Sequence, residues 1–306
     1  MFSEQNFVFS QANQDSLLGL LNRGLGEDPA GQGSAAGESV PVRTWARAEG
    51  TLLNAGDPFN ASIVGLEAGA DAALGPSGRV GAAVGYENVN LSDGDGGSAG
   101  QEIYRIGVYG SQSAGGLVFS AAAAYASASD RTDRASGLGP STAGRQSDAV
   151  TGGVEVSAPF IDGGVSLTPT GGVLISDVTG GAFTEFNGHL SAFAIHGDSS
   201  SVTAVAPFAQ VSMSHAFTLS GGAVVTPNVL IGYRYDGSAS SGAVTLVSED
   251  GTVFVGNKLN LDPNTAVLGV GLSAHQNALT AFVKFRATVS TNWNEETLTA
   301  GLRWSF

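Results

Sequence analysis

The sequence contains no cysteine, so it can form neither a disulfide framework nor a thiolate metal site. Charged residues are few, at 13% of the chain, and lysine and arginine form no cluster. The 13 basic and 27 acidic residues give a formal net charge of −14, which would repel the phosphate backbone of a nucleic acid. These absences exclude a disulfide-stapled domain and argue against a nucleic-acid partner.

Long hydrophobic runs are also missing. No stretch reaches the roughly 18 consecutive apolar residues of a membrane-spanning helix. The first residues, Met1 to Gln5, lack the basic and apolar segments of a secretory signal peptide, so an exported protein would have lost that peptide here. Hydrophobic residues nevertheless make up 42% of the sequence, which is too much for a disordered tail. The chain must therefore fold against something apolar.

From Pro41 onward, apolar and polar residues alternate with a period of two, which predicts β-strands. In the last segment, Leu298, Ala300, Leu302, Trp304 and Phe306 share one face, opposite Thr297, Thr299, Gly301, Arg303 and Ser305. We predict strands at residues 41–53, 60–74, 79–91, 102–111, 116–129, 147–158, 164–177, 201–217, 222–236, 264–274, 278–290 and 292–306. Many of them reach the roughly 9 to 11 residues that a tilted strand needs to cross a bilayer.

The connections between these strands alternate between short and long. The short ones lie around residues 75–78, 112–115, 159–163, 218–221 and 275–277, and the long ones around 91–101, 131–146, 178–200 and 237–263. Outer-membrane barrels have short periplasmic turns and long extracellular loops, and closure leaves no unpaired edge in hydrocarbon. The pattern predicts an all-β fold, a transmembrane antiparallel up-and-down β-barrel of about 12 strands.

Three prolines and a group of aromatic residues bear on the limits of the strands. Pro169, Pro207 and Pro227 fall inside predicted strands, where each removes a ladder donor, so we expect strand ends, bulges or projecting stretches there. Aromatic residues near strand ends predict girdles at the two membrane interfaces. They are Trp45, Trp293, Trp304, Phe306, Tyr86, Tyr125, Tyr233 and Tyr235.

Residues 1–40 follow a different pattern. The run from Asp15 to Gly24 has an N-cap candidate, two pairs of leucines and a terminal glycine, which predicts a short helix. The stretch from Gly26 to Val40, rich in Gly, Ala and Ser, is typical of a flexible linker. Phe2 to Phe9 could be the end of an upstream domain. We therefore divide the chain into residues 1–40, a passenger tail with a linker helix and a Gly-rich linker, and residues 41–306, the barrel.

The order of leucine-bearing helix, Gly-rich linker and barrel resembles the autotransporter β-domain family over nearly the whole chain. The segments that carry the resemblance are Val42-Arg43-Thr44-Trp45-Ala46-Arg47, Gly65-Leu66-Glu67-Ala68-Gly69-Ala70-Asp71 and Gly81-Ala82-Ala83-Val84-Gly85-Tyr86. The last eight residues look like the terminal β-signal of outer-membrane proteins, in which an aromatic residue closes an alternating strand. We identify Leu302, Trp304 and Phe306 as that signal.

The resemblance implies a non-enzymatic translocator of type V secretion in the outer membrane of a Gram-negative bacterium. Such a barrel exports an upstream passenger and anchors it at the cell surface, with the linker helix inside the pore. The helix leucines are Leu17, Leu18, Leu20 and Leu21. The implied partners are the barrel-assembly machinery, periplasmic chaperones, outer-membrane lipids, lipopolysaccharide and the chain's own passenger. We expect a monomer without a cofactor.

Some family members cleave the linker at an asparagine beside lumen carboxylates. This chain has Asn13 and Asn22 but no Asn-Asn pair, so we expect the passenger to stay uncleaved.

The predicted inward face suits a helix in the pore. Its small residues would leave space for one: Gly65, Gly69, Gly81, Gly85, Gly107, Ala122, Ala124 and Gly152. Its charged residues would line a polar lumen: Arg43, Arg47, Glu49, Glu67, Asp71, Glu87, Arg105, Glu155, Arg234, Lys284, Arg286, Glu295 and Arg303. These charges could hydrogen-bond the helix, or pair with one another and merely fill the pore.

Other motifs carry less weight. Gly96-Gly97-Ser98-Ala99-Gly100 matches a nucleophile elbow, but that motif needs a strand, a sharp turn and a helix, and here it lies in a loop. The four histidines lack metal-ligand spacing. Three alternatives remain: a stand-alone outer-membrane channel plugged by its N-terminal helix, an outer-membrane phospholipase or protease, and a soluble all-β adhesin or lectin. The enzyme would need catalytic residues that converge at the rim, and the sequence offers no such set.

Overall fold

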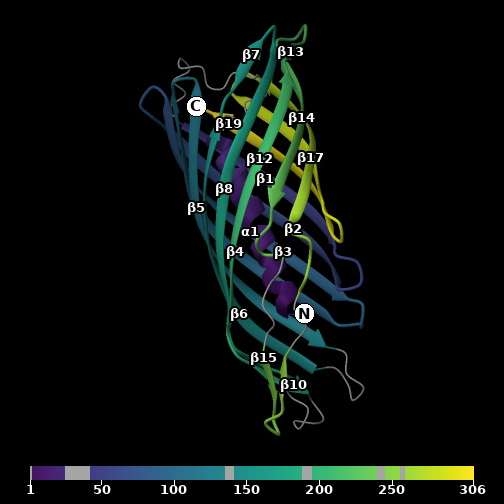
Figure 1. The fold of residues 1–306 in the computed structure, drawn as a ribbon. Helices are drawn as coiled ribbons and strands as arrows, with labels where there is room; N and C mark the ends of the chain where they lie inside the picture. Colours follow the sequence, from purple (N-terminus) through teal and green to yellow (C-terminus); the bar gives the residue numbers. More distant parts are fainter. Residues whose placement is uncertain (1, 25–41, 135–140, 188–194, 240–244, 256–258) are drawn as a thin grey trace.

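The computed structural model describes residues 2–24, 42–134, 141–187, 195–239, 245–255 and 259–306, which form a closed antiparallel barrel around a helix (Figure 1). Its twelve long strands are β1 (Val42–Asn54), β2 (Phe59–Leu74), β3 (Gly78–Asp93), β4 (Ser98–Ala114), β5 (Leu117–Arg134), β6 (Ser141–Ser157), β8 (Val165–Gly180), β12 (Ser200–His215), β14 (Val224–Tyr235), β17 (Asn264–Gln276), β18 (Leu279–Val289) and β19 (Asn294–Ser305). Each pairs with the next in this series, and β19 pairs with β1. The predicted up-and-down barrel is confirmed.

The two ends of the barrel differ, and we call them the turn end and the loop end. At the turn end, β7 (Phe160–Asp162) and β13 (Phe217–Thr218) extend two of the short turns. At the loop end, β9 (Phe183–Thr184), β11 (Ile195–Gly197), β15 (Thr245–Ser248) and β16 (Val253–Val255) form a separate four-stranded sheet, and β10 (Phe186–Asn187) pairs with β6. In Figure 1 the turn end is at the top with the C-terminus, and the loop end is at the bottom with the N-terminus.

The helix α1 (Phe2–Gly24) lies inside the barrel and runs from the loop end toward the turn end (Figure 1). The predicted start at Asp15 is wrong: Asp15 lies in the middle of the helix, and Phe2 to Phe9 form its first turns. The reason is tertiary packing, because Phe7 and Phe9 are fully buried and extend the helix beyond its local signals. The predicted linker, residues 26–40, lies outside the described residues. Within the described part of the chain, no helix has the length and hydrophobicity needed to cross a bilayer.

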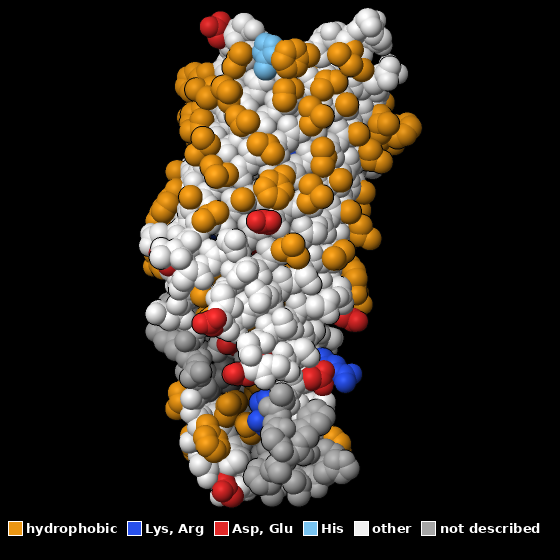
Figure 2. Space-filling model, turned by 90° about the vertical axis from the view of Figure 1, so that its right-hand side faces the viewer, with side chains coloured by type: hydrophobic (Ala, Val, Ile, Leu, Met, Phe, Trp, Pro, Cys, Tyr) orange, Lys and Arg blue, Asp and Glu red, His pale blue; other side chains and the backbone are white. Residues whose placement is uncertain are grey.

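The alternation of apolar and polar residues changes phase along several strands. Toward the turn end of β2, Val64 and Leu66 face outward and Glu67 faces inward. Toward the loop end of the same strand, Phe59 and Ile63 face inward. The outer surface consequently has a broad apolar band over the turn-end half and is mostly polar over the loop-end half (Figure 2).

The strands β5 and β6 extend farther toward the loop end than the sequence predicted. The predicted segments were 116–129 and 147–158, so part of the expected long connection at 131–146 is strand. In this region the outward residues are polar, as Ser127 and Arg131 show. The apolar residues that mark an outward strand face are therefore missing there.

The three prolines all lie one residue beyond the end of a ladder. The β6–β8 ladder ends at Thr170, next to Pro169. The β12–β14 ladder runs from Phe208 to Ser214 on one strand and from Arg234 to Asn228 on the other, so Pro207 and Pro227 flank it. Each proline remains paired with the strand on its other side. The missing donor thus falls where the ladder has already ended.

Candidate functional site: the helix in the lumen

The second half of α1 packs a leucine face against the barrel wall. Leu17, Leu20 and Leu21 are fully buried, and Leu18 is 8% exposed. They form a cluster with Ala122, Ala124, Leu174, Ala206 and Phe208 of the wall. A β-carbon at Gly107 would lie 2.8 Å from Leu20 Cδ1, so this glycine lets the wall approach the helix closely. The predicted helix leucines therefore all lie within the barrel.

The small inward residues serve two purposes rather than the single one that was predicted. Gly107, Ala122 and Ala124 border the helix, whereas Gly69 and Gly81 make room for the rings of Trp45 and Tyr109. At Gly65, a β-carbon would lie 2.7 Å from Glu87 Cγ. Much of the space left by glycine on β2 and β3 is therefore filled by other barrel side chains.

The prediction for Gly152 is wrong. Inward positions on β6 are odd-numbered, as buried Thr151 and Glu155 show, so Gly152 faces outward. Gly153 is the inward residue, and a β-carbon there would lie 3.2 Å from both Leu17 and Leu21.

A glycine in the helix permits a second close approach. A β-carbon at Gly19 would collide with the Arg47 guanidinium, so this glycine lets Arg47 lie directly against the helix backbone. Arg47 in turn forms an ion pair with Glu67 at 2.5 Å, and Ser16 donates a hydrogen bond to the same carboxylate at 3.2 Å.

Polar side chains of the first half of α1 accept hydrogen bonds from barrel arginines. Arg145 donates to Asn6 Oδ1 at 2.7 Å, Arg105 to Asn13 Oδ1 at 2.9 Å and Arg234 to Gln11 Oε1 at 2.8 Å. Barrel carboxylates compensate two of these arginines, since Asp130 pairs with Arg145 at 2.8 Å and Glu87 pairs with Arg105 at 2.6 Å. Asn6 and Asn13 are thus each bound by a cation whose charge a barrel carboxylate already balances.

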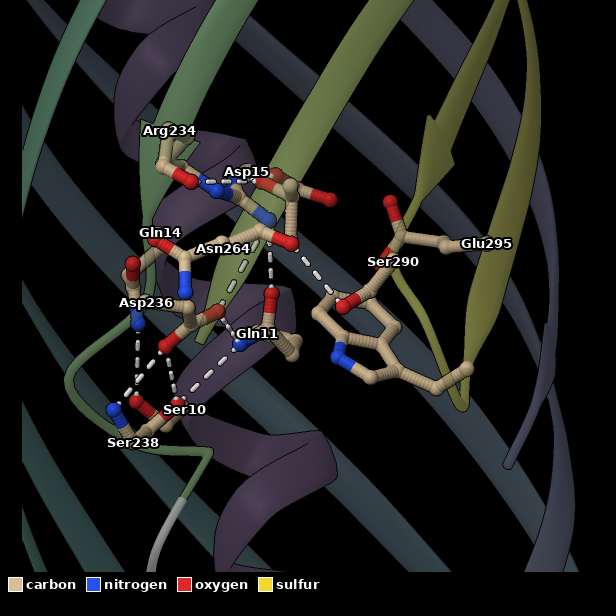
Figure 3. A network of polar contacts seen from close by, with 12 residues as sticks. Ser10, Gln11, Gln14, Asp15, Arg234, Asp236, Ser238, Asn264, Ser290 and Glu295 are labelled. Atoms are coloured by element: carbon tan, nitrogen blue, oxygen red, sulfur yellow. Dashed lines mark hydrogen bonds and ion pairs between the residues drawn. The ribbon is translucent and has the colours of Figure 1, made fainter. Parts of the chain in front are cut away.

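Asp15 is the charged centre of the helix. Its carboxylate forms an ion pair with Arg234 at 2.9 Å (Figure 3). It forms a second ion pair with Arg286 at 2.5 Å. Arg286 also contacts Glu295 at 3.3 Å. Because Arg234 belongs to β14 and Arg286 to β18, this one helix residue ties α1 to the wall opposite the leucine face. The helix is therefore fixed from both sides.

The thirteen predicted lumen charges all face inward. Arg47, Glu67, Arg105, Arg234 and Arg286 contact the helix. Others contact barrel residues: Asp71 pairs with Arg43 at 3.2 Å and Lys284 lies over the ring of Phe282. Both kinds of contact that the sequence left open therefore occur in this lumen.

Sequence reasoning missed four charged residues of the lumen, namely Arg79, Asp130, Arg145 and Asp236. Arg79 pairs with Asp71 at 2.5 Å, and Asp236 approaches Arg234 to 3.8 Å. Arg145 lies in the predicted connection at residues 131–146, and Asp130 directly precedes it. The parity of β5 and β6, had it been continued past their apolar positions, would have assigned both residues to the inside.

The loop-end half of the lumen contains an apolar layer beside these polar contacts. Phe7, Val8 and Phe9 are fully buried within it. Phe7 packs edge-on against Trp293 and Phe59, with ring centroids 5.5 and 6.2 Å apart. The barrel and its connections also contribute Leu53, Ile63, Val89, Leu91, Ile103, Ala126, Ala149, Val178, Ala239, Leu259 and Leu261.

A cavity lies beside the helix in the turn-end half. It has a volume of about 250 Å³, and hydroxyl and amide side chains of β8, β12, β14 and β17 form much of its wall. Asp15, Gly19 and Arg47 lie at its helix side, while Val118 and Ser166 lie near the turn-end rim. The lumen is therefore filled unevenly, with space for water on one side of α1.

Two of the predicted girdle aromatics are instead inside the barrel. Trp45 is 4% exposed and donates a hydrogen bond to Tyr109 Oη at 2.8 Å. Trp293 is 3% exposed and donates to the Asp262 carbonyl at 2.9 Å. The other predicted members face outward, and Trp304 and Phe306 stack on each other at 6.1 Å.

The three predicted signal residues lie on the outer face at the turn end. Leu302, Trp304 and Phe306 are exposed by 54%, 51% and 65%. Among the described residues, no group of three or more histidine, aspartate or glutamate side chains is placed to hold a metal ion.

Comparisons with known proteins agree with this architecture. The profile of the autotransporter β-domain family matches residues 44–286. A search of curated protein sequences found no match.

Among solved structures, the fold resembles the translocator domain of the autotransporter NalP from Neisseria meningitidis, with a TM-score of 0.72, 15% identity and coverage of 98% of this chain and 97% of that one. It also resembles the β-domain of the Bordetella autotransporter BrkA, with a TM-score of 0.69, 16% identity and coverage of 87% and 100%. The transport unit of the autotransporter AIDA-I from Escherichia coli matches with a TM-score of 0.51, 11% identity and coverage of 88% of this chain and 92% of that one. At these identities the likeness concerns the fold alone. The family match covers most of the barrel, and this chain therefore belongs to the autotransporter β-domain family, the outer-membrane translocators of type V secretion that export a passenger.

Proposed function

We propose that the passenger exported by this barrel is attached through α1 and stays anchored at the cell surface by the helix in the lumen. The observation that carries the proposal is the direction of α1, whose N-terminal end lies at the loop end (Figure 1). Long loops are extracellular and short turns periplasmic in outer-membrane barrels. A passenger joined to that end would therefore leave the barrel on the outside.

In this proposal residues 1–40 form the tether and residues 41–306 form the translocator. The helix is retained by its leucine face and by the ion pairs of Asp15 with Arg234 and Arg286. Buried charges whose partners are removed cost much free energy, so these pairs oppose withdrawal of the helix. The other lumen charges support the wall that holds it.

An uncleaved tether is part of the proposal. Asn13, the one asparagine in the central turns of α1, has both of its amide atoms engaged. Its Nδ2 donates to the Phe9 carbonyl at 2.7 Å, and its Oδ1 accepts from Arg105. An amide held in this way is poorly placed to attack its own backbone.

Assembly in the membrane requires partners beyond the chain. We propose that the exposed side chains of Leu302, Trp304 and Phe306 are bound by the barrel-assembly machinery after passage with periplasmic chaperones. Once inserted, the monomeric barrel would contact outer-membrane lipid through its apolar band and lipopolysaccharide around its loop end.

The test fuses a folded reporter upstream of residue 1, behind a signal peptide, and exposes intact cells to protease. A Phe306 deletion serves as the control. We expect cleavage of the reporter only with the intact C-terminus. A barrel that reaches the outer membrane while its reporter stays protected would contradict the proposal and favour a stand-alone channel.

A further inference from the structure

The apolar layer of the loop-end half borders the helix on several sides. Its members come from strands β1 to β6 and β8, from the connection between β14 and β17, and from the turn before β19. At its centre, the side chains of Phe7, Val8 and Phe9 have no exposed surface. An ion that crossed this layer would lose its hydration without gaining polar ligands, which is costly.

Two sectors of the same level are polar, but the groups of each are bound to one another. In the first, Arg145 donates to Asn6 Oδ1 at 2.7 Å and pairs with Asp130, which also accepts from Gln101 at 2.9 Å.

The second sector lies beside the start of the connection between β14 and β17. Gln11 of α1 donates to Asp236 and, at 3.1 Å, to Ser238 Oγ, and all three residues are fully buried (Figure 3). Asp236 also accepts from the Ser238 hydroxyl at 2.6 Å. Because the groups of both sectors already have partners, the two sectors close the layer instead of opening a path for water.

The charged layer around Asp15 has a different surrounding. Asp15, Arg47 and Arg286 all border the cavity of about 250 Å³ that extends to the turn-end rim. Water can therefore reach the charges of this level from the turn end. A permeating ion could bind to the charged side chains beside this cavity in place of its lost water. This level therefore opposes the passage of an ion less than an apolar layer does.

We propose that the permeability barrier of the closed translocator is the apolar layer around Phe7, and that the lumen on the turn-end side of it is open to solutes from the periplasm. The helix then has two separable roles, since Asp15 holds it in place while Phe7 makes the barrel tight. The inference needs only the barrel in a membrane and goes beyond passenger export.

The first experiment measures the conductance of the full chain in planar lipid bilayers. The double variant Phe7→Ser with Trp293→Ala removes the two central rings, and we expect its conductance to exceed that of the unchanged protein several-fold. Phe254→Ser is the matched control, because Phe254 lies at the same end of the barrel but is 48% exposed. Mobility in unheated gels establishes that each barrel is folded.

The rival location is tested with Asp15→Asn. Opening of the barrel by Asp15→Asn, together with a closed Phe7→Ser and Trp293→Ala variant, would overturn the proposal. A folded double variant with unchanged conductance would overturn it as well.

A second experiment avoids large changes and exploits the absence of cysteine from the chain. Single cysteines replace Ser212 or Asn228 in the cavity and Ala126 or Ala149 in the apolar layer. In liposomes of known protein orientation, a charged thiol reagent should modify the cavity positions from the turn-end side several-fold faster than from the loop-end side. The layer positions should resist it from both sides. Equal modification of Ser212→Cys from the two sides would overturn the proposal, whatever the first experiment gives.

Discussion

The turn-end and loop-end halves of this barrel are built from the same strands with opposite polarity. On β3 the outward residues of the turn-end half are apolar, such as Val84, and the inward ones include Glu87. Beyond that level Val89 and Leu91 point inward, opposite Asn90. The pleat continues without interruption, so only the choice of residues changes. The outer face of one strand is therefore apolar in the turn-end half, where it suits lipid, and polar in the loop-end half, where it suits water.

The level of this change is marked by tyrosine. Tyr86 and Tyr104 are direct neighbours across β3 and β4, with ring centroids 5.2 Å apart on the outer face. Tyrosine places its ring in lipid and its hydroxyl in water, so it suits the edge of the bilayer. The loop-end half thus behaves as a water-soluble domain with its own apolar core, and α1 supplies part of that core.

The largest effect should follow from emptying the loop-end core. Phe59→Ala removes a fully buried ring that packs against Phe7, and we expect a loss of about 3–5 kcal/mol in the free energy of unfolding. Urea unfolding of the protein in phospholipid vesicles measures it. Phe254→Ala, at an exposed position of the same end, should change little, and an equal loss in both variants would refute an apolar core there.

The next largest effect should come from a charge placed on the outer face, which we expect to be costly in the turn-end half and tolerated in the loop-end half. Val108 and Glu102 both point outward on β4, Val108 within the apolar band and Glu102 beyond Tyr104. Val108→Arg should lower the free energy of unfolding by about 2–4 kcal/mol, the range for a basic residue facing lipid. Glu102→Arg should be tolerated. Urea unfolding in vesicles measures both variants. Similar losses of unfolding free energy at the two positions would mean that the bilayer edge does not lie at the level of Tyr104.

Two adjacent glycines sharpen the contrast between the inside and the outside. Gly153→Val should press on Leu174 of the wall and on Leu17 and Leu21 of α1. We expect it to lower the free energy of unfolding by about 1–3 kcal/mol, the usual range for overpacking. Gly152→Val, on the outer face, should be nearly neutral. Hydrogen exchange of the α1 amides reports whether the helix loosens. Unchanged protection in Gly153→Val would mean that the wall yields instead of the helix.

The smallest effect concerns a connection at the loop end. Hydrogen bonds from the Thr291 hydroxyl and from Asn264 hold the pKa of Asp262 below its usual range. A lowered folded pKa gives a contribution that is present above the unfolded pKa and lost as pH falls through the folded value. The protection of the amides at residues 290–293, measured relative to their intrinsic exchange rates at each pH, should therefore fall on acidification, and in Asp262→Asn it should already be low at neutral pH. Protection that does not change with pH would exclude the carboxylate as the cause.

The barrel was predictable because its outer band repeats a simple period, whereas the contents of the lumen depend on partners far apart in sequence. Asn6, Gln11 and Asn13 gave no helical signal of their own, and the arginines that bind them lie on β6, β14 and β4. The first half of α1 was accordingly missed. The leucine face of its second half was recognised because it carries an apolar pattern.

Two other errors were avoidable from the sequence. Trp45 has the same parity as Arg43 and Arg47, which were assigned to the inside, so its ring had to point inward too. Gly152 likewise has the opposite parity to Glu155. The position of Trp293 was harder to foresee, because it lies in a turn and its partners are Phe7 and the Asp262 carbonyl.

The ladder between β1 and β19 has a consequence for the order of events in folding. All other barrel ladders join strands that follow one another, so each hairpin can form locally. The ladder from Arg43–Ser305 to Asn54–Asn294 joins the two ends of the barrel sequence and requires the largest loop closure of all. Contacts so distant along the chain form slowly. Until β19 arrives, β1 remains an open edge, so the wall is complete only when the strand farthest from β1 along the barrel sequence has joined it.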